Sequence, residues 1–271
     1  MGEPEFEHDG SLVTVVVDGQ PQSAVDLDDP TRLDFEYVQH LALCVDALAP
    51  AGPLRVTHVG GAGLTLARWV QHTRPGSPQI VFEPDAALTD AVRRQLPLPR
   101  GHRIRVRALD GMSGVAGLRD VSADVVLVDA YRHGRIPPEL GSLEWFAEVA
   151  RVVGPRGLLL ANLADEPGMR YATRVAVGAR QAFGHAAFVA LHEVLKGKRF
   201  GNLVLVASRG PLDVWTLRRA TASAPLPTGV LAGDQLQWRT AGARPFRAGA
   251  GDTASSPDPP HRGAWRRGRS R

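Results

Sequence analysis

The sequence has almost no cysteine. Its 271 residues contain a single one, Cys44, so no disulfide can form within the chain, and a reducing compartment is the natural expectation. Long hydrophobic runs are also missing, because no apolar stretch approaches the roughly 20 residues that a membrane-spanning helix needs. The first ten residues are polar and acidic, unlike a secretory signal peptide. We therefore expect a cytoplasmic protein with no membrane partner.

Several catalytic and metal-binding signatures are missing as well. Neither a Gly-x-Ser-x-Gly elbow nor a Walker loop occurs. The nine histidines show no metal-ligand spacing with Cys44, so no metal site is predicted, and His40 and His58 are expected in the core. A dinucleotide-binding turn would need a third glycine at position 66, where Leu66 stands. This weakens the case for a nicotinamide dehydrogenase without removing it.

The positive charge of the chain is confined to one end. The formal net charge is +4, but residues 239–271 hold eight arginines and two aspartates, so the other 238 residues carry −2. The basic segment is rich in Gly, Pro, Ala and Ser and has no hydrophobic period, so we predict disorder from about residue 240. We expect no specific nucleic-acid partner, because the folded part is slightly acidic.

The rest of the chain predicts an α/β protein. Residues 12–27, with Asp18-Gly19 as the turn, predict an N-terminal β-hairpin within an extension over 1–30. Residues 31–210 alternate short apolar runs with amphipathic stretches, which is typical of βαβ units and a mostly parallel sheet. Residues 211–271 are assigned to a C-terminal extension. The expected strands of the central domain are Leu54–Val59, Gln79–Glu83, Arg103–Leu109, Asp124–Asp129, Gly157–Asn162 and, as an antiparallel pair at the sheet edge, Ala186–Val194 and Leu203–Ala207.

Helices are expected before and between these strands. The four residues Asp28–Thr31 carry helix-start chemistry, and apolar residues recur at helical spacing from Arg32 to Leu48. The remaining expected helices are Leu64–His72, Ala86–Leu96, Met112–Leu118, Leu143–Val152 and Met169–Ala182.

The first two strand ends predict a nucleoside site, because ligands of such sheets lie beyond the carboxyl ends of the strands. The first strand runs into a turn that contains Gly60, Gly61 and Gly63. Glycine permits close backbone approach to a ligand, and the next helix offers N-terminal amides, although a tight strand–helix turn would look the same. The second strand ends at Glu83, where a carboxylate can accept from both ribose hydroxyls or cap the next helix.

The next two strands also end in acids. Asp110-Gly111 follows the third strand, and its carboxylate could accept from an adenine amino group, cap a helix, or do both. Asp129 ends the fourth strand and would face the reacting end of the ligand, as a general base or as a partner for a cationic amine. A helix-capping role is the alternative for Asp129 too.

From residue 12 to about residue 208 the chain resembles the spermidine synthase (polyamine aminopropyltransferase) family, which shares its core with class I methyltransferases. Besides the strand ends, the resemblance is carried by Asp18-Gly19-x-x-Gln22-Ser23 and by Asp34-x-Glu36-Tyr37-x-x-His40. It implies a Rossmann-like methyltransferase sandwich with a mostly parallel seven-stranded sheet. By the resemblance, Glu83 binds the ribose, Asp110-Gly111 lies at the adenine, Asp129 is the catalytic aspartate and Tyr37 lies beside the amine substrate.

The chain also departs from the pattern of that family. Family synthases usually have an aspartate where Gly63 stands, and a second substrate acid where Arg132 stands. Val38 replaces a family glutamine, and the basic stretch 196–202 has no match for a later family tyrosine. Arg132 would repel a diamine and, with the basic residues near it, would favour an anionic acceptor.

The leading expectation is therefore a transferase that uses S-adenosylmethionine or its decarboxylated form as a co-substrate. It would move an aminopropyl or methyl group to a small-molecule acceptor, with no metal. The alternatives are a methyltransferase acting on an anionic acceptor and a non-catalytic nucleoside-binding or interaction protein. Because the family often forms oligomers, a homodimer is among the expectations.

Overall fold

An N-terminal antiparallel sheet precedes the main domain. The computed structural model describes residues 2–248 and 252–260. The expected hairpin is confirmed as strands β2 (Leu12–Val17) and β3 (Gln20–Asp26), and β1 (Glu5–Asp9) adds a third strand. Residues Asp18 and Gly19 make the turn with φ of 49° and 65°, the conformation that tight hairpin turns require. The extra strand escaped prediction because β1 is almost wholly exposed and acidic and lacks an apolar pattern.

Within the described residues the central sheet has eight strands, one more than the seven expected, in the order β11-β9-β10-β8-β7-β4-β5-β6. Five strands are parallel, and β10, β9 and β11 continue the sheet in antiparallel pairs. The five are β4 (Val56–Val59), β5 (Gln79–Phe82), β6 (Ile104–Arg107), β7 (Ala123–Val128) and β8 (Val153–Asp165); the antiparallel strands are β9 (His185–Leu191), β10 (Gly201–Ser208) and β11 (Thr228–Ala232).

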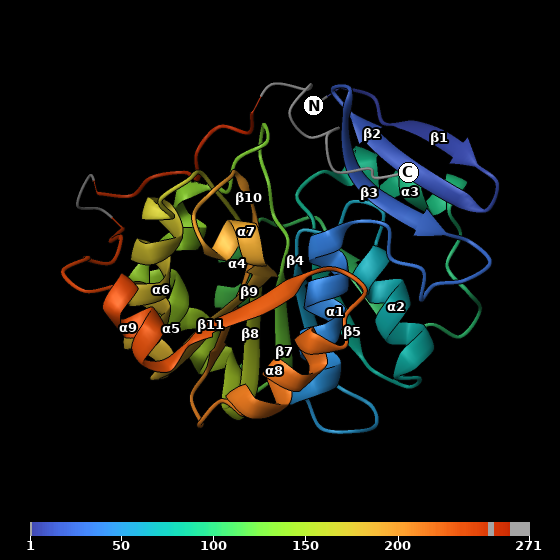
Figure 1. The fold of residues 1–271 in the computed structure, drawn as a ribbon. Coiled ribbons are helices and arrows are strands. Elements are labelled where there is room, and N and C mark those ends of the chain that lie inside the picture. Colours follow the sequence, from blue (N-terminus) through green and yellow to red (C-terminus); the bar gives the residue numbers. More distant parts are fainter. Residues whose placement is uncertain (1, 249–251, 261–271) are drawn as a thin grey trace.

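The sheet edge is formed by β11, which comes from the segment expected to be a C-terminal extension. The predicted pair β9 and β10 exists, but it lies inside the sheet because β11 pairs with β9 from Thr228↔Leu191 to Ala232↔Ala187. Figure 1 shows β11 crossing the front of the molecule between helices α8 (Val214–Ala222) and α9 (Gly233–Arg239). The strand is only five residues long and begins Thr-Gly, which gives too short an apolar run to predict from sequence.

Helices cover both faces of the sheet and build two large hydrophobic clusters. Strand β7 supplies both, with Val125 and Leu127 in one and Val126 and Val128 in the other, as expected of a strand buried on both faces. One face is covered by α1 (Glu36–Leu48), α2 (Thr65–Thr73) and α8; the other by α4 (Gly111–Ala116), the short 3-10 helix η1 (Pro138–Gly141), α5 (Leu143–Val152) and α6 (Arg170–Phe183). A third cluster packs the N-terminal sheet against α2, α3 (Ala86–Gln95) and the β5–β6 side of the sheet.

Two helix boundaries differ from the expectation. Helix α1 begins at Glu36, not near Arg32, because the polar residues before it form a turn of their own: Asp26 accepts from the backbone amides of Asp28 and Asp29 at 3.0 Å each. The predicted strand Ala186–Val194 ends at Leu191, and the four-residue helix α7 (His192–Leu195) follows it.

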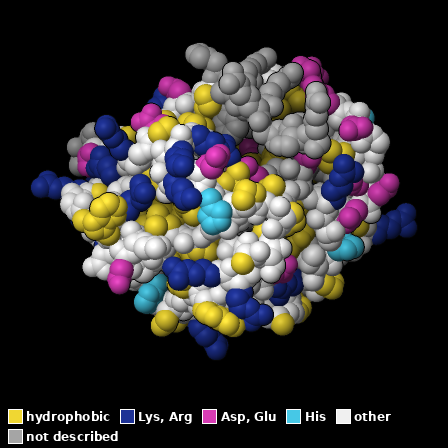
Figure 2. Space-filling model, viewed as in Figure 1, with side chains coloured by type: hydrophobic (Ala, Val, Ile, Leu, Met, Phe, Trp, Pro, Cys, Tyr) yellow, Lys and Arg dark blue, Asp and Glu magenta, His cyan; other side chains and the backbone are white. Residues whose placement is uncertain are grey.

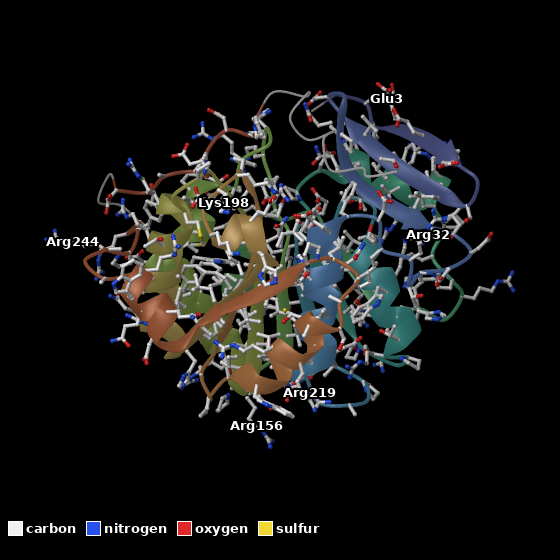
Figure 3. The ribbon with its side chains drawn as sticks, viewed as in Figure 1. Glu3, Arg32, Arg156, Lys198, Arg219 and Arg244 are labelled. Atoms are coloured by element: carbon white, nitrogen blue, oxygen red, sulfur yellow. The ribbon has the colours of Figure 1, made fainter. Side chains whose placement is uncertain are left out.

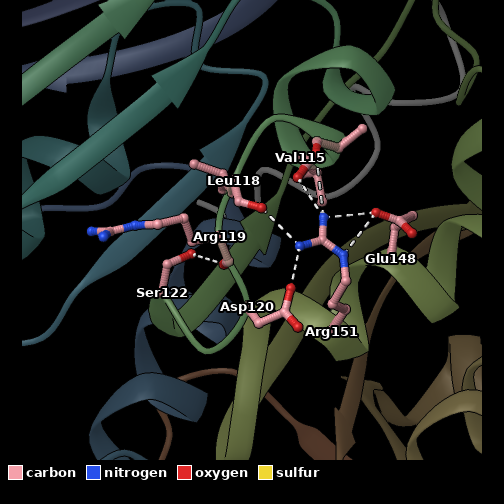
Figure 4. Close-up of polar contacts among 8 residues, drawn as sticks. Val115, Leu118, Arg119, Asp120, Ser122, Glu148 and Arg151 are labelled. Atoms are coloured by element: carbon pink, nitrogen blue, oxygen red, sulfur yellow. Dashed lines mark hydrogen bonds and ion pairs between the residues drawn. The ribbon is translucent and has the colours of Figure 1, made fainter.

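An arginine joins α5 to the segment that enters β7, at the end of the sheet opposite to the carboxyl ends (Figure 4). The guanidinium of Arg151 donates to Glu148 Oε2 at 2.8 Å, to Asp120 Oδ1 at 2.8 Å and to the Leu118 carbonyl at 2.7 Å. A single side chain therefore links the loop after α4 to α5 and fixes where β7 begins.

Part of the C-terminal segment, for which composition predicts disorder from about residue 240, packs against the domain. Phe246 is 3% exposed, and its carbonyl accepts from the Leu143 amide at 2.9 Å. Its ring lies 5.5 Å from that of Tyr171, and the Arg174 guanidinium sits 3.9 Å from its centroid. One buried aromatic side chain thus anchors a segment whose composition alone indicates no fold. Residues 249–251 and 261–271 lie outside the described residues.

Residues 252–260 contact the loop that follows β7. Ser256 is fully buried; its Oγ accepts from the Ile136 amide at 2.9 Å and its carbonyl from Arg135 Nε at 2.8 Å. Asp258 adds an ion pair with Arg135 at 3.3 Å. This part of the C-terminal segment therefore packs against the loop that follows Asp129 and stabilises it.

We predict that Phe246→Ala lowers the free energy of unfolding by about 3 kcal/mol, because truncating a buried phenylalanine leaves a cavity and here also removes the stacked Arg174. Denaturant unfolding followed by circular dichroism measures the change. Trp238→Ala is the control, since Trp238 is 80% exposed and its removal should change stability by less than about 0.5 kcal/mol. Equal unfolding midpoints for Phe246→Ala and wild type would contradict the packing of this segment.

Candidate nucleoside and transfer site

The glycine turn after β4 touches the end of β7. Gly60 has a φ of +80°, and a Cβ built on it would lie 2.2 Å from the Asp129 carbonyl oxygen. Only glycine fits there, because any side chain would collide with backbone. Ala62 and Leu64 also have positive φ, of 31° and 62°, so the turn is tightly wound. The predicted turn and the predicted catalytic aspartate are therefore adjacent through their backbones.

Glu83 lies at the same turn. Its carboxylate, which is 8% exposed, accepts from the amides of Gly61 at 3.2 Å, Ala62 at 3.4 Å and Asp85 at 3.1 Å. Burial raises the pKa of Glu83, and these three backbone donors act against that rise. The side chain that caps α3 is Asp85, which accepts from the Leu88 amide at 2.8 Å. The sequence alternative, in which Glu83 caps this helix, therefore does not hold.

Asp110 caps α4, which is one of the two roles that the sequence left open. Its Oδ1 accepts from the Ser113 amide at 2.9 Å, and the hydrogen bonds from Ser113 hold its pKa below the ordinary value. Gly111 lets α4 begin against β4, since a Cβ there would lie 2.4 Å from Val59 Cγ1. The adenine role of Asp110 stays a prediction.

Asp129 directly follows β7 and lies among polar side chains from two other elements, β8 and α1. Asn162 on β8 donates from Nδ2 to Asp129 Oδ1 at 2.9 Å, and the Tyr37 hydroxyl on α1 also hydrogen-bonds the carboxyl. Burial raises the pKa of Asp129 to about 6, against the opposing effect of these two hydrogen bonds. A carboxyl with this pKa can take up a proton near neutral pH.

Two residues of this cluster were missed by the sequence reasoning. The Asn162 side chain reaches Asp129 because β7 and β8 are parallel neighbours in register, with Val128 opposite Ala161. Asn162 is the last residue of the fifth strand expected from the sequence. It could therefore have been predicted by the same rule that placed site residues at the ends of the other four strands. The other missed residue is Tyr131, whose hydroxyl lies 3.5 Å from the Asn162 carbonyl oxygen. Nothing in the sequence separates Tyr131 from a surface tyrosine.

Tyrosines flank Asp129 on two sides. Burial raises the pKa of Tyr37 well above its ordinary value, and the neighbouring Asp129 charge adds to the rise. Tyr131 is raised for the same two reasons. Both phenols are therefore neutral at physiological pH and act as hydrogen-bonding groups, not as charges.

Arg132 lies outside this buried cluster. It forms a tight two-residue turn with Arg135, with amide–carbonyl hydrogen bonds of 2.8 and 3.1 Å in the two directions, and its side chain is exposed. The turn residues His133 and Gly134 have φ of 51° and 75°. The structure thus places Arg132 three residues after Asp129 on an exposed hairpin.

Basic side chains do gather near the start of α1. Figure 2 shows Lys and Arg side chains over the region of α7, and Figure 3 shows Lys198 on the same side of the molecule as α7, with Arg156 and Arg219 at the opposite end. Arg199 lies 4.0 Å from Glu36, the residue before Tyr37, and 3.4 Å from Glu193. Two acids therefore compensate the charge of Arg199.

Gly63 lies against the N-terminal sheet. A Cβ on Gly63 would meet Ser23 Oγ at 2.9 Å and Val25 Cγ2 at 3.1 Å. Thr65 fixes this contact, since its Oγ1 lies 2.7 Å from Ser23 Oγ and donates to the Ala24 carbonyl at 2.9 Å. An acidic side chain at position 63 therefore does not fit beside Ser23 in this arrangement.

Within residues 2–248 and 252–260, no group of three or more His, Cys, Asp or Glu side chains is placed to hold a metal ion. His40 and His58 are buried as expected, and they bond to Thr228 at 2.9 Å and Gln79 at 2.8 Å respectively. No helix in this part of the chain is long and apolar enough to cross a membrane.

Sequence comparison finds curated relatives for about half of the chain or more. No family model matches it. The polyamine aminopropyltransferase of Chromobacterium violaceum is 25% identical over 164 residues, which are 60% of this chain and 62% of that protein. The polyamine aminopropyltransferase of Neisseria meningitidis serogroup A is 26% identical over 145 residues, 52% of this chain and 53% of that one. The chain thus spans less than two thirds of the length of these relatives.

Structure comparison extends the likeness to almost the whole chain. A probable spermidine synthase from Corynebacterium glutamicum has 27% sequence identity and a TM-score of 0.82, with 95% of both chains covered. Human methyltransferase-like protein 13, solved in complex with SAH, shares the fold with a TM-score of 0.56 at 18% identity, covering 80% of this chain and 97% of that chain. The chain is therefore similar to the polyamine aminopropyltransferases, known also as spermidine synthases, and has a methyltransferase-like Rossmann fold.

Proposed function

We propose that the chain is a transferase that binds an adenosyl sulfonium nucleoside at the glycine turn and moves its alkyl group to an amine held at Asp129. The observation that carries the proposal is the position of Asp129. Its carboxyl is partly buried, has a pKa of about 6, and belongs to a residue whose carbonyl would collide with a Cβ on Gly60 of the turn. An acid of that kind beside a nucleoside turn suits proton removal from a nucleophile.

The nucleoside would be held by the residues at the strand ends. Glu83 would exchange its contacts with the turn amides for the two ribose hydroxyls, and each charge-assisted hydrogen bond contributes roughly 1.5–3 kcal/mol. Asp110 and the start of α4 would lie at the adenine. The turn amides of Gly61 and Ala62, which Glu83 now occupies, are within reach of the same ligand.

The transfer step needs little from the protein beyond placement. The amine lone pair attacks the carbon bound to the sulfonium, the C–N bond forms as the C–S bond breaks, and the sulfur keeps the electron pair as a neutral thioether. The nitrogen proton passes to the Asp129 carboxylate, while Tyr37 and Asn162 hold that carboxylate in place. Alignment of nucleophile and sulfonium supplies much of the rate.

Methyl transfer from S-adenosylmethionine is the second candidate, and Gly63 is the observation that favours it. An aminopropyl donor carries a terminal ammonium that an acid would normally hold, and the Ser23 contact leaves no room for one at position 63. S-adenosylmethionine carries the same ammonium, but a carboxylate beside it balances the charge, so this donor depends less on an acid at position 63.

One assay separates the candidates. The protein is incubated with S-adenosylmethionine or its decarboxylated form, together with diamines, polyamines or carboxylate-bearing acceptors, and the nucleoside products are identified by mass spectrometry. We expect methylthioadenosine from the decarboxylated donor, dependent on an amine. S-adenosylhomocysteine from the carboxylated donor would establish methyl transfer instead. Neither product, with nucleoside binding intact, would mean a non-catalytic binding protein.

A further inference from the structure

A buried asparagine, Asn202, hydrogen-bonds the residue that donates to Asp129. Asn202 lies at the start of β10, is 8% exposed, and donates from Nδ2 to Asn162 Oδ1 at 2.9 Å. The two strands are antiparallel with Val204 opposite Asn162, so Asn162 and Asn202 are diagonal neighbours on one face of the sheet. The result is a continuous chain of side chains from Asn202 through Asn162 to Asp129.

The direction of this chain is set at both of its ends, because the Asp129 carboxylate only accepts and Asn202 donates to Asn162. A primary amide has one accepting oxygen and one donating nitrogen, and Asn162 is 2% exposed, so water does not compete for either. Because Asn202 donates to Oδ1 of Asn162, the nitrogen of Asn162 must point the other way, to the Asp129 carboxylate. A flipped amide would place its oxygen against the carboxylate and leave two acceptors facing each other.

Asn202 is itself held by the site. Tyr131 lies close enough to Asn202 for that side chain to lower the pKa of its phenol, and the Tyr131 hydroxyl lies 3.5 Å from the Asn162 carbonyl oxygen. Asn202 is therefore fixed between β8 and the loop after β7.

We propose that Asn202 is a positioning residue, which fixes the Asn162 amide so that its nitrogen faces the Asp129 carboxylate. The inference rests on the proposed role of Asp129 as the group that takes up the proton. The titratable groups that act on Asp129 are Tyr37 from α1 and Tyr131 from its own loop, and both are neutral near pH 6. Neighbouring strand β8 contributes the uncharged amide of Asn162. The hydrogen bond from Asn162 is therefore the main contact whose loss would change the affinity of Asp129 for a proton.

The test compares Asn202→Leu with wild type in protein labelled with carboxyl-¹³C aspartate. The Asp129 resonance is assigned by its absence from Asp129→Asn, and its pKa is read from a pH titration. Without Asn202 the Asn162 amide can turn, the carboxylate loses a donor, and we expect the pKa of Asp129 to rise by about one unit. Ser208→Ala is the matched control, since Ser208 is 5% exposed at the far end of the same strand and should leave that pKa unchanged.

An unchanged pKa of Asp129 in folded Asn202→Leu would overturn the inference. Asn202→Ala, which adds no bulk, provides the same comparison if the leucine variant does not fold. The titration needs no catalysis, so its outcome is separate from that of the transferase assay. A shifted pKa in a chain without transferase activity would support the positioning role and refute the proposed function. An unshifted pKa of Asp129 in a chain that has transferase activity would refute the positioning role of Asn202 and support the proposed function.

Discussion

Asp129→Asn is expected to lower the rate of alkyl transfer by roughly 10²–10⁴-fold, the range that a positioned general base contributes. Asparagine keeps the size of the side chain and can still accept from Asn162, so the nucleoside affinity should stay near the wild-type value. The release of methylthioadenosine measures the rate, and calorimetry measures the affinity. Equal rates for the variant and wild type would remove Asp129 from the chemistry.

The same substitution should stabilise the fold at neutral pH. The pKa of Asp129 is about 6 in the folded protein and near 3.8 when unfolded, so folding favours the protonated form. Wild-type stability therefore falls as pH rises from about 4 through 6, and Asp129→Asn escapes this loss. We expect a gain on the order of 2 kcal/mol at pH 7 that vanishes near pH 4.

Asp124, at the other end of β7, provides a control of opposite sign. Burial raises its pKa, but the hydrogen bonds from Arg55 outweigh burial and hold the pKa below the ordinary value. Its ion pair with Arg55 is partly exposed. Asp124→Asn should therefore lose stability at pH 7, by at most about 1 kcal/mol. A destabilised Asp129→Asn would contradict the assigned burial of Asp129.

Gly60→Ala should lower the free energy of unfolding by about 3 kcal/mol or more and abolish nucleoside binding. The new Cβ would lie 2.2 Å from the Asp129 carbonyl oxygen and 2.7 Å from its carbonyl carbon, at a φ of +80°. Both the backbone strain and the forced separation of the turn from β7 contribute to this loss. Thermal unfolding and calorimetry with methylthioadenosine measure the two effects.

Gly52→Ala measures the cost of backbone strain alone, without the steric collision that Gly60→Ala also introduces. Gly52 has a φ of +88°, but no heavy atom lies within 4 Å of its added Cβ. Its substitution should lower stability by about 1 kcal/mol and leave nucleoside binding intact. Similar losses for Gly52→Ala and Gly60→Ala would mean that the turn does not press on β7.

Features of the fold and the site that depend on local sequence pattern could be predicted from the sequence. The apolar run of β7, the glycine turn after β4 and the acids at the strand ends follow from periodicity and from the fixed geometry of parallel sheets. Gly60 and Asp129 do meet, and Glu83 does lie at the turn. The roles of Glu83, Asp110 and Arg132 toward ligands remain predictions.

What could not be predicted depends on contacts far apart in the chain. Phe246 is buried by Tyr171 and Arg174, and Ser256 by the loop that contains Ile136, so a segment without hydrophobic period is still ordered. Strand β11 is stabilised by pairing with β9, not by its own short apolar run. Local composition carries no information about such partners.

Calorimetric titration of the unmodified protein with methylthioadenosine tests the nucleoside site at the glycine turn most directly. We expect one site per chain and a binding heat that Glu83→Ala greatly reduces, since Glu83 would hold the ribose. Saturable binding that Glu83→Ala leaves unchanged, or no binding at millimolar nucleoside, would contradict it.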